Sequence, residues 1–194
     1  MTRSALAPLL LAIGLSAAPV LAQSAGIGAL APGDDVSPLL SVFQAGIVCA
    51  QDTTETSPAP GTIAGFTNII TTEPDFVSPA RRVPAVLGIG FGVKSRARRP
   101  PGYDNVLVTV THPPMGANGV TVETYTTAIK GEDGTPGLSI TLFQFDTDYE
   151  LVTGPWTISA SESGKQLFHA EFTVVPPREV PELAQVCHYE GLLS

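Results

Sequence analysis

Charged residues are scarce in this 194-residue sequence, and the acidic ones outnumber the basic ones. They make up 14% of the chain, with 18 aspartate and glutamate residues against 10 lysine and arginine residues. Binding to nucleic acid or to an anionic membrane surface needs positive charge, so this balance argues against both kinds of partner. Apolar runs long enough to form a transmembrane helix are also lacking, so we expect no membrane insertion.

Cysteine is almost absent, since the chain has only Cys49 and Cys187. There is no C-x-x-C pair, and His188 would be a lone extra ligand, so nothing here predicts a metal site or a cofactor. In an oxidising compartment an isolated pair of cysteines most simply forms one disulfide. We therefore expect a Cys49–Cys187 disulfide, with free thiols or a metal-binding pair as the alternatives.

The first 22 residues have the pattern of a secretory signal peptide. Arg3 supplies a basic start, residues 9–15 form an apolar run, and Val20, Leu21 and Ala22 give a cleavage pattern of the A-x-A type. The apolar run is too short to anchor the chain in a bilayer. We expect a mature, periplasmic or secreted protein of unknown oligomeric state that begins at Gln23.

Turn-forming residues are abundant in the rest of the chain, with 19 glycines and 18 prolines in the full sequence. Between the turns, apolar and polar residues alternate, as in antiparallel strands with one buried face. This pattern predicts an all-β fold, an antiparallel β-sandwich of about seven to eight strands. We expect a flexible lead-in over residues 23–38, the sandwich over 39–175, and a tail over 176–194 that the disulfide ties back.

Two of the expected strands have informative patterns. Residues 83–93 (VPAVLGIGFGV) carry a glycine at every second position from 88 to 92, which leaves one bare face for the close approach of another backbone or of a large aromatic side chain from the facing sheet. No helix follows these glycines, so they do not form a phosphate-binding loop. Residues 120–129 (VTVETYTTAI) divide into two faces, one with Val120, Val122 and Ala128 and the other with Thr121, Glu123, Tyr125 and Thr127.

The densest charge feature is a basic segment that holds Lys94, Arg96, Arg98 and Arg99. Four cations within six residues could bind phosphate or carboxylate groups of an envelope polymer or of an acidic partner. The alternative is a solvated hairpin loop whose charges pair with acids such as Asp104. These four residues are our ligand-binding candidates.

Two further motifs are interpreted mainly as structural. His112, Pro113, Pro114 and Met115 end a strand, because proline cannot donate to a ladder, although a ligand-facing loop is the alternative. Asp146, Asp148 and Glu150 alternate, so a strand would place them on one face. Three carboxylates can bind Ca²⁺, but a solvated edge that opposes aggregation is the simpler interpretation.

No residue pattern indicates catalysis. His169 and Glu171 share a face, and Ser159 or Ser161 could complete a triad with His169, but no G-x-S-x-G turn positions a nucleophile. We therefore expect no enzyme activity. A hydrolase for envelope polymers or small esters, with His112 or His169 as base, stays open as an alternative.

Several segments together resemble the DUF3859 family of secreted bacterial domains of unknown function. They are residues 46–48 (GIV), 83–93, 111–115 (THPPM), 149–156 (YELVTGPW) and 164–174 (GKQLFHAEFTV). The resemblance implies an export signal and an immunoglobulin-like sandwich, and it brings no known activity or site residues.

These observations predict an exported immunoglobulin-like module that binds a protein or a cell-envelope component without catalysis. A structural part of an envelope assembly is a further alternative, because such a part would also be exported without a visible site.

Overall fold

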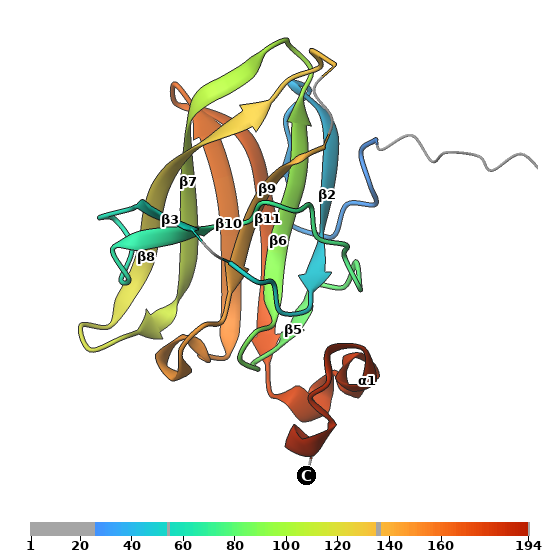
Figure 1. Cartoon of the computed structure of the whole chain (residues 1–194), viewed down its shortest axis with the longest axis vertical. Helices are drawn as coiled ribbons and strands as arrows, with labels where there is room; N and C mark the ends of the chain where they lie inside the picture. The colour runs from blue at the N-terminus through green and yellow to red at the C-terminus, as the bar shows by residue number, and fades with distance from the viewer. Residues whose placement is uncertain (1–25, 54, 135–136, 194) are drawn as a thin grey trace, which may run out of the picture.

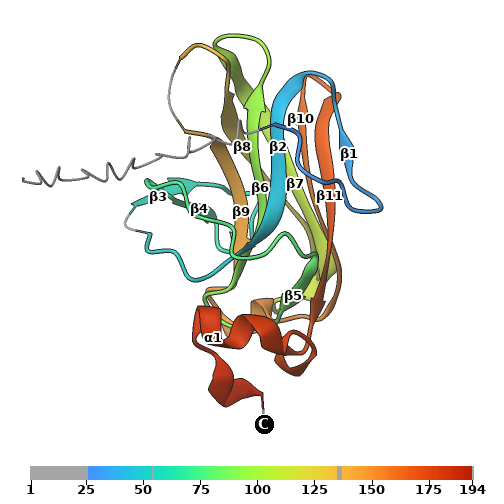
Figure 2. The ribbon, with the colours of Figure 1, turned by 90° about the vertical axis from the view of Figure 1, so that its right-hand side faces the viewer.

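The computed structural model describes residues 26–53, 55–134 and 137–193, which form two β-sheets packed face to face (Figures 1 and 2). The larger sheet has the order β1-β11-β10-β7-β8, with β5 pairing to β11, and the smaller sheet has the order β2-β6-β9. A separate hairpin joins β3 to β4. The predicted signal peptide, residues 1–22, lies outside the described residues. The strands are β1 (Asp35–Val36), β2 (Leu40–Val48), β3 (Glu55–Pro58), β4 (Phe66–Ile69), β5 (Arg82–Pro84), β6 (Gly90–Ala97), β7 (Gly102–Met115), β8 (Val120–Lys130), β9 (Ser139–Gln144), β10 (Gly154–Glu162) and β11 (Lys165–Val175).

The connectivity of the seven long strands is of the immunoglobulin type. In chain order, the first, second and fifth (β2, β6, β9) form one sheet, and the third, fourth, sixth and seventh (β7, β8, β10, β11) form the other. In the constant-type immunoglobulin domain the fourth strand lies with the first, second and fifth, whereas here β8 pairs with β7. All pairings among these seven strands are antiparallel, which confirms the predicted all-β, immunoglobulin-like sandwich.

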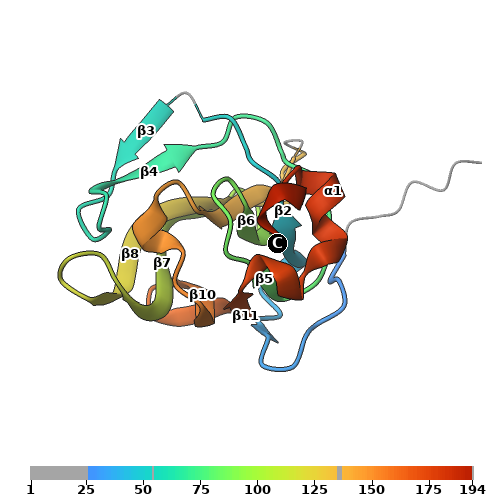
Figure 3. The same cartoon turned by 90° about the horizontal axis from the view of Figure 1, so that it is seen from below.

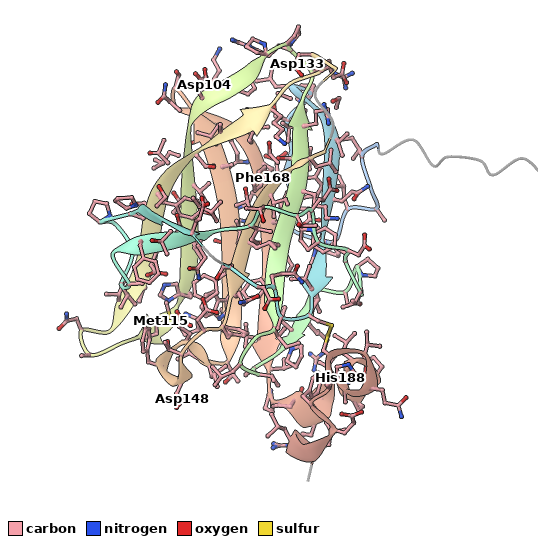
Figure 4. All side chains as sticks on the ribbon, viewed as in Figure 1. Asp104, Met115, Asp133, Asp148, Phe168 and His188 are labelled. Atoms are coloured by element: carbon pink, nitrogen blue, oxygen red, sulfur yellow. A yellow bond between two sulfur atoms is a disulfide. The ribbon has the colours of Figure 1, made fainter. Side chains whose placement is uncertain are left out.

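An aromatic cluster fills the space between the sheets. The Phe91 ring, in β6, lies 5.6 Å from the Trp156 ring in β10 and 5.0 Å from the Phe172 ring in β11, measured between centroids. Trp156 is fully buried, and its indole N–H donates to the carbonyl of Val152 at 3.1 Å. Facing sheets need such large fillers, and Phe168, labelled in Figure 4, is another of them.

Residues 83–93 do not form one strand, so that expectation is wrong: β5 ends at Pro84 beside β11, Gly88 lies in a turn with a positive φ, and β6 begins at Gly90. Within β6, the bare face at Gly90 and Gly92 lies close to the neighbouring strands. A Cβ atom at Gly92 would overlap the carbonyl oxygen of Thr141 in β9, and one at Gly90 would lie 2.8 Å from Cγ2 of Val48. Glycine is required here because the adjacent strands approach too closely for a side chain.

The proline motif at residues 112–115 does not end its strand, and this prediction is wrong. β7 continues to Met115. The register between β7 and β8 shifts between Thr111 and Met115, so Pro113 and Pro114 have no ladder partners. Their missing N–H groups therefore cost no ladder hydrogen bond.

The segments on either side of the sandwich pack against it. In the predicted lead-in, β1 pairs with β11, and the buried carboxylate of Asp34 lies 2.6 Å from Nη2 of Arg81. At the other end the tail lies against one side of the base of the sandwich, near β2 and β5 (Figure 3). It contains η2 (Pro177–Glu179), η3 (Pro181–Leu183), α1 (Ala184–Cys187) and η4 (Glu190–Leu192).

The predicted disulfide is present. Cys49, just after β2, is bonded to Cys187 at the end of α1, with a Cα–Cα distance of 5.2 Å. Figure 4 shows it as a yellow bond beside His188. Tail residues Val180, Leu183 and Tyr189 are buried against the sandwich, so packing and the covalent bond hold the tail together. None of the helices in the described part of the chain could span a bilayer.

Candidate functional site

The β3–β4 hairpin and its loop, residues 55–69, lie across the open side of the sandwich, where β8 ends one sheet and β9 ends the other (Figures 1 and 3). We call this segment the flap. The backbone N–H of Thr124 in β8 donates to the carbonyl of Gly61 at 2.9 Å. On the other side, the Asn68 amide donates to Asp146, just after β9, at 2.8 Å. The flap is thus attached to both edge strands.

A cleft of about 560 Å³ lies beneath the flap. That volume falls within the range of pockets that hold small ligands or short polymer segments. Aromatic and polar side chains line it together, which is the mixture that orients a ligand by a few polar groups within an apolar surface. The lining includes Phe66 and Asn68 from the flap, Glu123, Tyr125, Thr127 and Lys130 from β8, Phe143 and Gln144 from β9, and Asp146, Tyr149 and Glu150 beyond it.

The face of β8 that turns into the sandwich is the polar one. Tyr125 pairs with Val108 of β7 and Glu123 pairs with Val110, and both valines are buried in the core. Cross-strand partners share a face, so Glu123, Tyr125 and Thr127 point inward. We call these three residues the polar stripe. Val122, on the outer face, is 49% exposed. An edge strand of a sandwich normally turns its apolar side chains inward, so this inversion marks the cleft as unusual.

Burial affects two titratable groups of the cleft. Burial raises the pKa of Tyr125, so its hydroxyl stays neutral at physiological pH and can both donate and accept hydrogen bonds. Burial also raises the pKa of Glu150, and hydrogen bonds to its carboxylate from Thr147 and Asp146 oppose that shift. Lys130 is the one cation among the described residues that line the cleft. The cleft therefore favours a polar ligand that is neutral or carries positive charge.

His112 lies behind the polar stripe. Its buried ring packs on Trp156, with 4.8 Å between centroids, and its Nε2 lies 3.9 Å from Oε2 of Glu123. The other carboxylate oxygen of Glu123, Oε1, accepts a hydrogen bond from the backbone N–H of Ile63 in the flap at 2.5 Å. Glu123 thus connects a buried histidine to the flap.

The four predicted ligand-binding cations lie away from this cleft and contact other parts of the chain. Lys94 and Arg96 belong to β6, not to a loop. Lys94 is buried, with Nζ 3.3 Å from Oε1 of Glu73. Arg96 donates to the carbonyls of Gly131 and Gly137, Arg98 to those of Pro38 and Leu40, and the Arg99 guanidinium lies over the Tyr103 ring at 4.9 Å. Their role as ligand contacts stays a prediction.

The acidic residues after β9 do not lie on one face of a strand, so that prediction is wrong. β9 ends at Gln144, and Asp148–Glu150 form the short 3₁₀ helix η1. Oε2 of Glu150 turns back to accept hydrogen bonds from the backbone N–H groups of Asp146 and Thr147. The helix forms because this carboxylate caps its start. Across the described ranges, no group of three His, Cys, Asp or Glu residues is arranged to hold a metal ion.

One of the catalytic constellations considered from the sequence does come together. Ser159 and His169 are direct cross-strand partners in β10 and β11, and Oγ of Ser159 lies 2.8 Å from Nδ1 of His169. Nε2 of His169 lies 3.6 Å from Oε1 of Glu171. The three side chains lie on the outer face of the larger sheet, since their neighbours Ile158, Ala160 and Ala170 are buried. Ser161, by contrast, pairs with Gln166.

Reasoning from the sequence missed the polar stripe and the flap. The alternation in residues 120–129 defines the two faces of β8, but it does not show which face is buried. The flap begins in a segment rich in polar residues and proline, which has the composition of a loop. The sequence feature that could have indicated the polar stripe is the presence of a charged and an aromatic residue, Glu123 and Tyr125, on the same face of one strand.

No curated protein matches the chain. Among solved structures, an immunoglobulin-like protein from Pseudomonas aeruginosa matches at 17% sequence identity with a TM-score of 0.47, covering 76% of this chain and 100% of that chain. The family model described as "Domain of unknown function (DUF3859)" matches residues 36–174, which include nine of the eleven strands in full and most or part of the other two. The chain therefore belongs to the DUF3859 family.

Proposed function

We propose that this chain is an exported, non-catalytic binding module, and that a segment of a protein or of a cell-envelope component binds in the cleft beneath the flap. The observation that carries the proposal is the polar stripe on β8, which turns inward at the edge of an otherwise apolar sandwich. The stripe gives the cleft a carboxylate and two hydroxyl groups, and a few polar groups of this kind orient a ligand within an otherwise apolar pocket.

Tyr125 is the clearest of these groups. Its hydroxyl has no hydrogen-bond partner among the described residues, and burial alone accounts for its raised pKa. A neutral phenol in this position can donate to a carbonyl or accept from a hydroxyl or amide of a ligand. Thr127, the next residue along the polar stripe, offers a second hydroxyl to the same space.

Export is part of the proposal and has two supports. Residues 1–22 have the composition of a signal peptide. The disulfide between Cys49 and Cys187 is of the kind that persists in the periplasm and outside the cell, and is rare in the cytosol. A binding module in that setting would meet envelope polymers and exported proteins.

Capture experiments with a filled cleft test the proposal. Thr127→Trp places a large side chain in the cleft, and Val122→Trp places the same side chain on the outer face of the same strand. Tagged mature protein should capture its partner from cross-linked periplasm as wild type and as Val122→Trp, and Thr127→Trp should lose that capture. Equal capture by all three, with equal unfolding midpoints, would exclude the cleft as the binding site.

Hydrolysis is a second candidate function, favoured by the contacts that join Ser159, His169 and Glu171. It ranks lower because Ser159 pairs with Thr109 on one side and His169 on the other, so the ladders occupy the nearby backbone N–H groups that would stabilise an oxyanion. Turnover in an esterase screen that Ser159→Ala abolishes would support it. Turnover unchanged in that variant would exclude Ser159 as the nucleophile.

A further inference from the structure

We propose that one proton on the His112–Glu123 pair, carried by either group, keeps the flap closed, so that access to the cleft is controlled by pH. The inference deepens the proposed function and rests on it in one respect, that the flap controls access to a ligand-binding cleft. The latch itself is a property of the protein without ligand, and it is argued from the contacts of these two side chains.

The hydrogen bond at Nδ1 fixes the tautomer of His112. Nδ1 lies 2.8 Å from the carbonyl oxygen of Pro113, and a carbonyl oxygen can only accept, so Nδ1 carries a proton. In neutral imidazole the other ring nitrogen, Nε2, then has a lone pair and no proton. The side chain is fully buried against Trp156, so water does not reach Nε2.

Nε2 of His112 faces a carboxylate. It has no hydrogen-bond partner among the described residues, and Oε2 of Glu123 lies 3.9 Å away. An ionised carboxylate only accepts, so two unprotonated groups would present lone pairs to each other in a nearly dry site. One proton on either group removes that repulsion and gives an attractive pair. The observed arrangement therefore fits a pair that holds this proton.

The described groups that surround the pair supply no other positive charge next to Glu123. On β8, Tyr125 faces the same cleft and is neutral. From beyond β9, Asp146 and Glu150 add negative charge to the lining. The flap contributes a backbone N–H, and β10 contributes the Trp156 ring. Lys130 lies seven residues from Glu123 along β8, about 23 Å at the usual strand rise, so it cannot replace an imidazolium as the counter-charge.

Glu123 connects the protonation state of the pair to the flap, because it contacts both. Its Oε1 accepts the hydrogen bond from Ile63, beside the contact between Gly61 and Thr124. Once the proton leaves, the buried carboxylate has no counter-charge, and the cleft that Glu123 lines is its route to solvent. Rotation of Glu123 toward the cleft then releases the Ile63 N–H. Raising the pH removes this proton, so we expect a higher pH to open the flap.

Two conservative variants separate this latch from a purely structural role. In Glu123→Gln, the amide oxygen can accept from Ile63 while the amide N–H donates to neutral His112, so the latch needs no proton. In His112→Gln, the amide donates to Glu123 in place of the imidazolium, with the same consequence. Asn68→Ala is the matched control, because it loosens the flap at Asp146 and leaves the His112–Glu123 pair intact.

The test is amide hydrogen exchange of Ile63 in ligand-free mature protein at pH 5.5 and pH 8.0, expressed as a protection factor. Wild type and Asn68→Ala should both lose at least tenfold protection at the higher pH, and the two Gln variants should keep theirs. Protection in wild type that does not change with pH, or that falls equally in a folded Gln variant, would overturn the latch. Since no ligand is present, this failure would leave the capture results, and with them the proposed function, unaffected.

Discussion

Asn68 in the flap donates a 2.8 Å hydrogen bond to Oδ2 of Asp146, across 78 residues of chain. The other oxygen of that carboxylate accepts from the Gln144 side chain at the end of β9, at 2.9 Å. The flap is therefore held to the smaller sheet by one short polar contact at its exposed side, and to β8 by Gly61 and Ile63. Few contacts restrain the flap, as expected of a segment that opens over a binding site.

Removing the Asn68 contact should loosen the flap without unfolding the sandwich. We expect Asn68→Ala to cost about 0.5–1.5 kcal/mol locally, the net value of one hydrogen bond, and to leave the global unfolding midpoint almost unchanged. Limited proteolysis should cut residues 55–69 faster than in wild type. Gln166→Ala, which removes an exposed 2.7 Å contact to Asp35 on the other side of the molecule, is the control and should not change that rate. A rate unaffected by Asn68→Ala would show that this contact does not restrain the flap.

The disulfide should contribute strongly to stability, because it closes a loop with a sequence separation of 138 residues. In the chain-entropy model such a loop is worth about 4–5 kcal/mol, and measured values often fall below the model. We expect Cys49→Ala with Cys187→Ala to lower the free energy of unfolding by about 2–5 kcal/mol in a denaturant titration. The tail should also become sensitive to protease after residue 175. A double variant as stable as wild type would mean that tail packing alone is sufficient.

Tyr125 should make the protein sensitive to alkaline pH. Burial raises its pKa above the ordinary value of about 10, so the folded protein holds the phenolic proton more tightly than the unfolded chain does. The resulting stability is fully present below pH 10 and is lost as the pH rises further. Urea titrations should therefore show a smaller loss of stability above pH 10 in Tyr125→Phe than in wild type. An identical loss in both proteins would assign the alkaline sensitivity to other groups.

Trp156 should be the most costly single residue to truncate in the core. Its ring contacts Phe91, Phe143 and Phe145, and it supports His112 from the other side. Replacing a buried aromatic residue by alanine typically costs 3–5 kcal/mol, and we expect a loss in that range for Trp156→Ala from thermal or denaturant unfolding followed by circular dichroism. Trp156→Phe should lose less, because it retains most of the packed volume. Equal losses would indicate that the indole N–H bond to Val152 contributes most of the effect.

Local patterns in the sequence were sufficient for much of the sandwich. The β10–β11 hairpin follows from alternation on both sides of a tight turn, at which Ser163 and Gly164 both adopt positive φ angles. The bare face correctly predicted a close backbone neighbour at Gly92, although Gly88 lies in a turn outside the strand. The disulfide followed from compartment and cysteine count. In each case the prediction needed only the pattern of a few neighbouring residues or a property of the whole chain, such as its cysteine count.

The candidate site depends on relationships that local patterns do not contain. Whether the Tyr125 face of β8 points inward depends on its register with β7, a pairing that alternation alone does not fix. The prediction that Asp146, Asp148 and Glu150 share one face of a strand failed because Glu150 caps η1. Alternating carboxylates do not reveal whether a segment forms a strand or a turn. The prolines fit within β7 because the register between β7 and β8 shifts beside them, and this shift is visible only once the pairing of the two strands is known.

The most direct test of the central claim, that the cleft holds the ligand, is site-specific photo-cross-linking in the periplasm. A benzoyl-phenylalanine side chain would replace Phe66 at the cleft in one protein and Leu107 on the outer face of β7 in another, two positions with similar exposure of 44% and 45%. The cleft-binding account predicts one reproducible adduct from position 66 and none from position 107. Adducts from position 107 alone, or equal adducts from both positions, would contradict it.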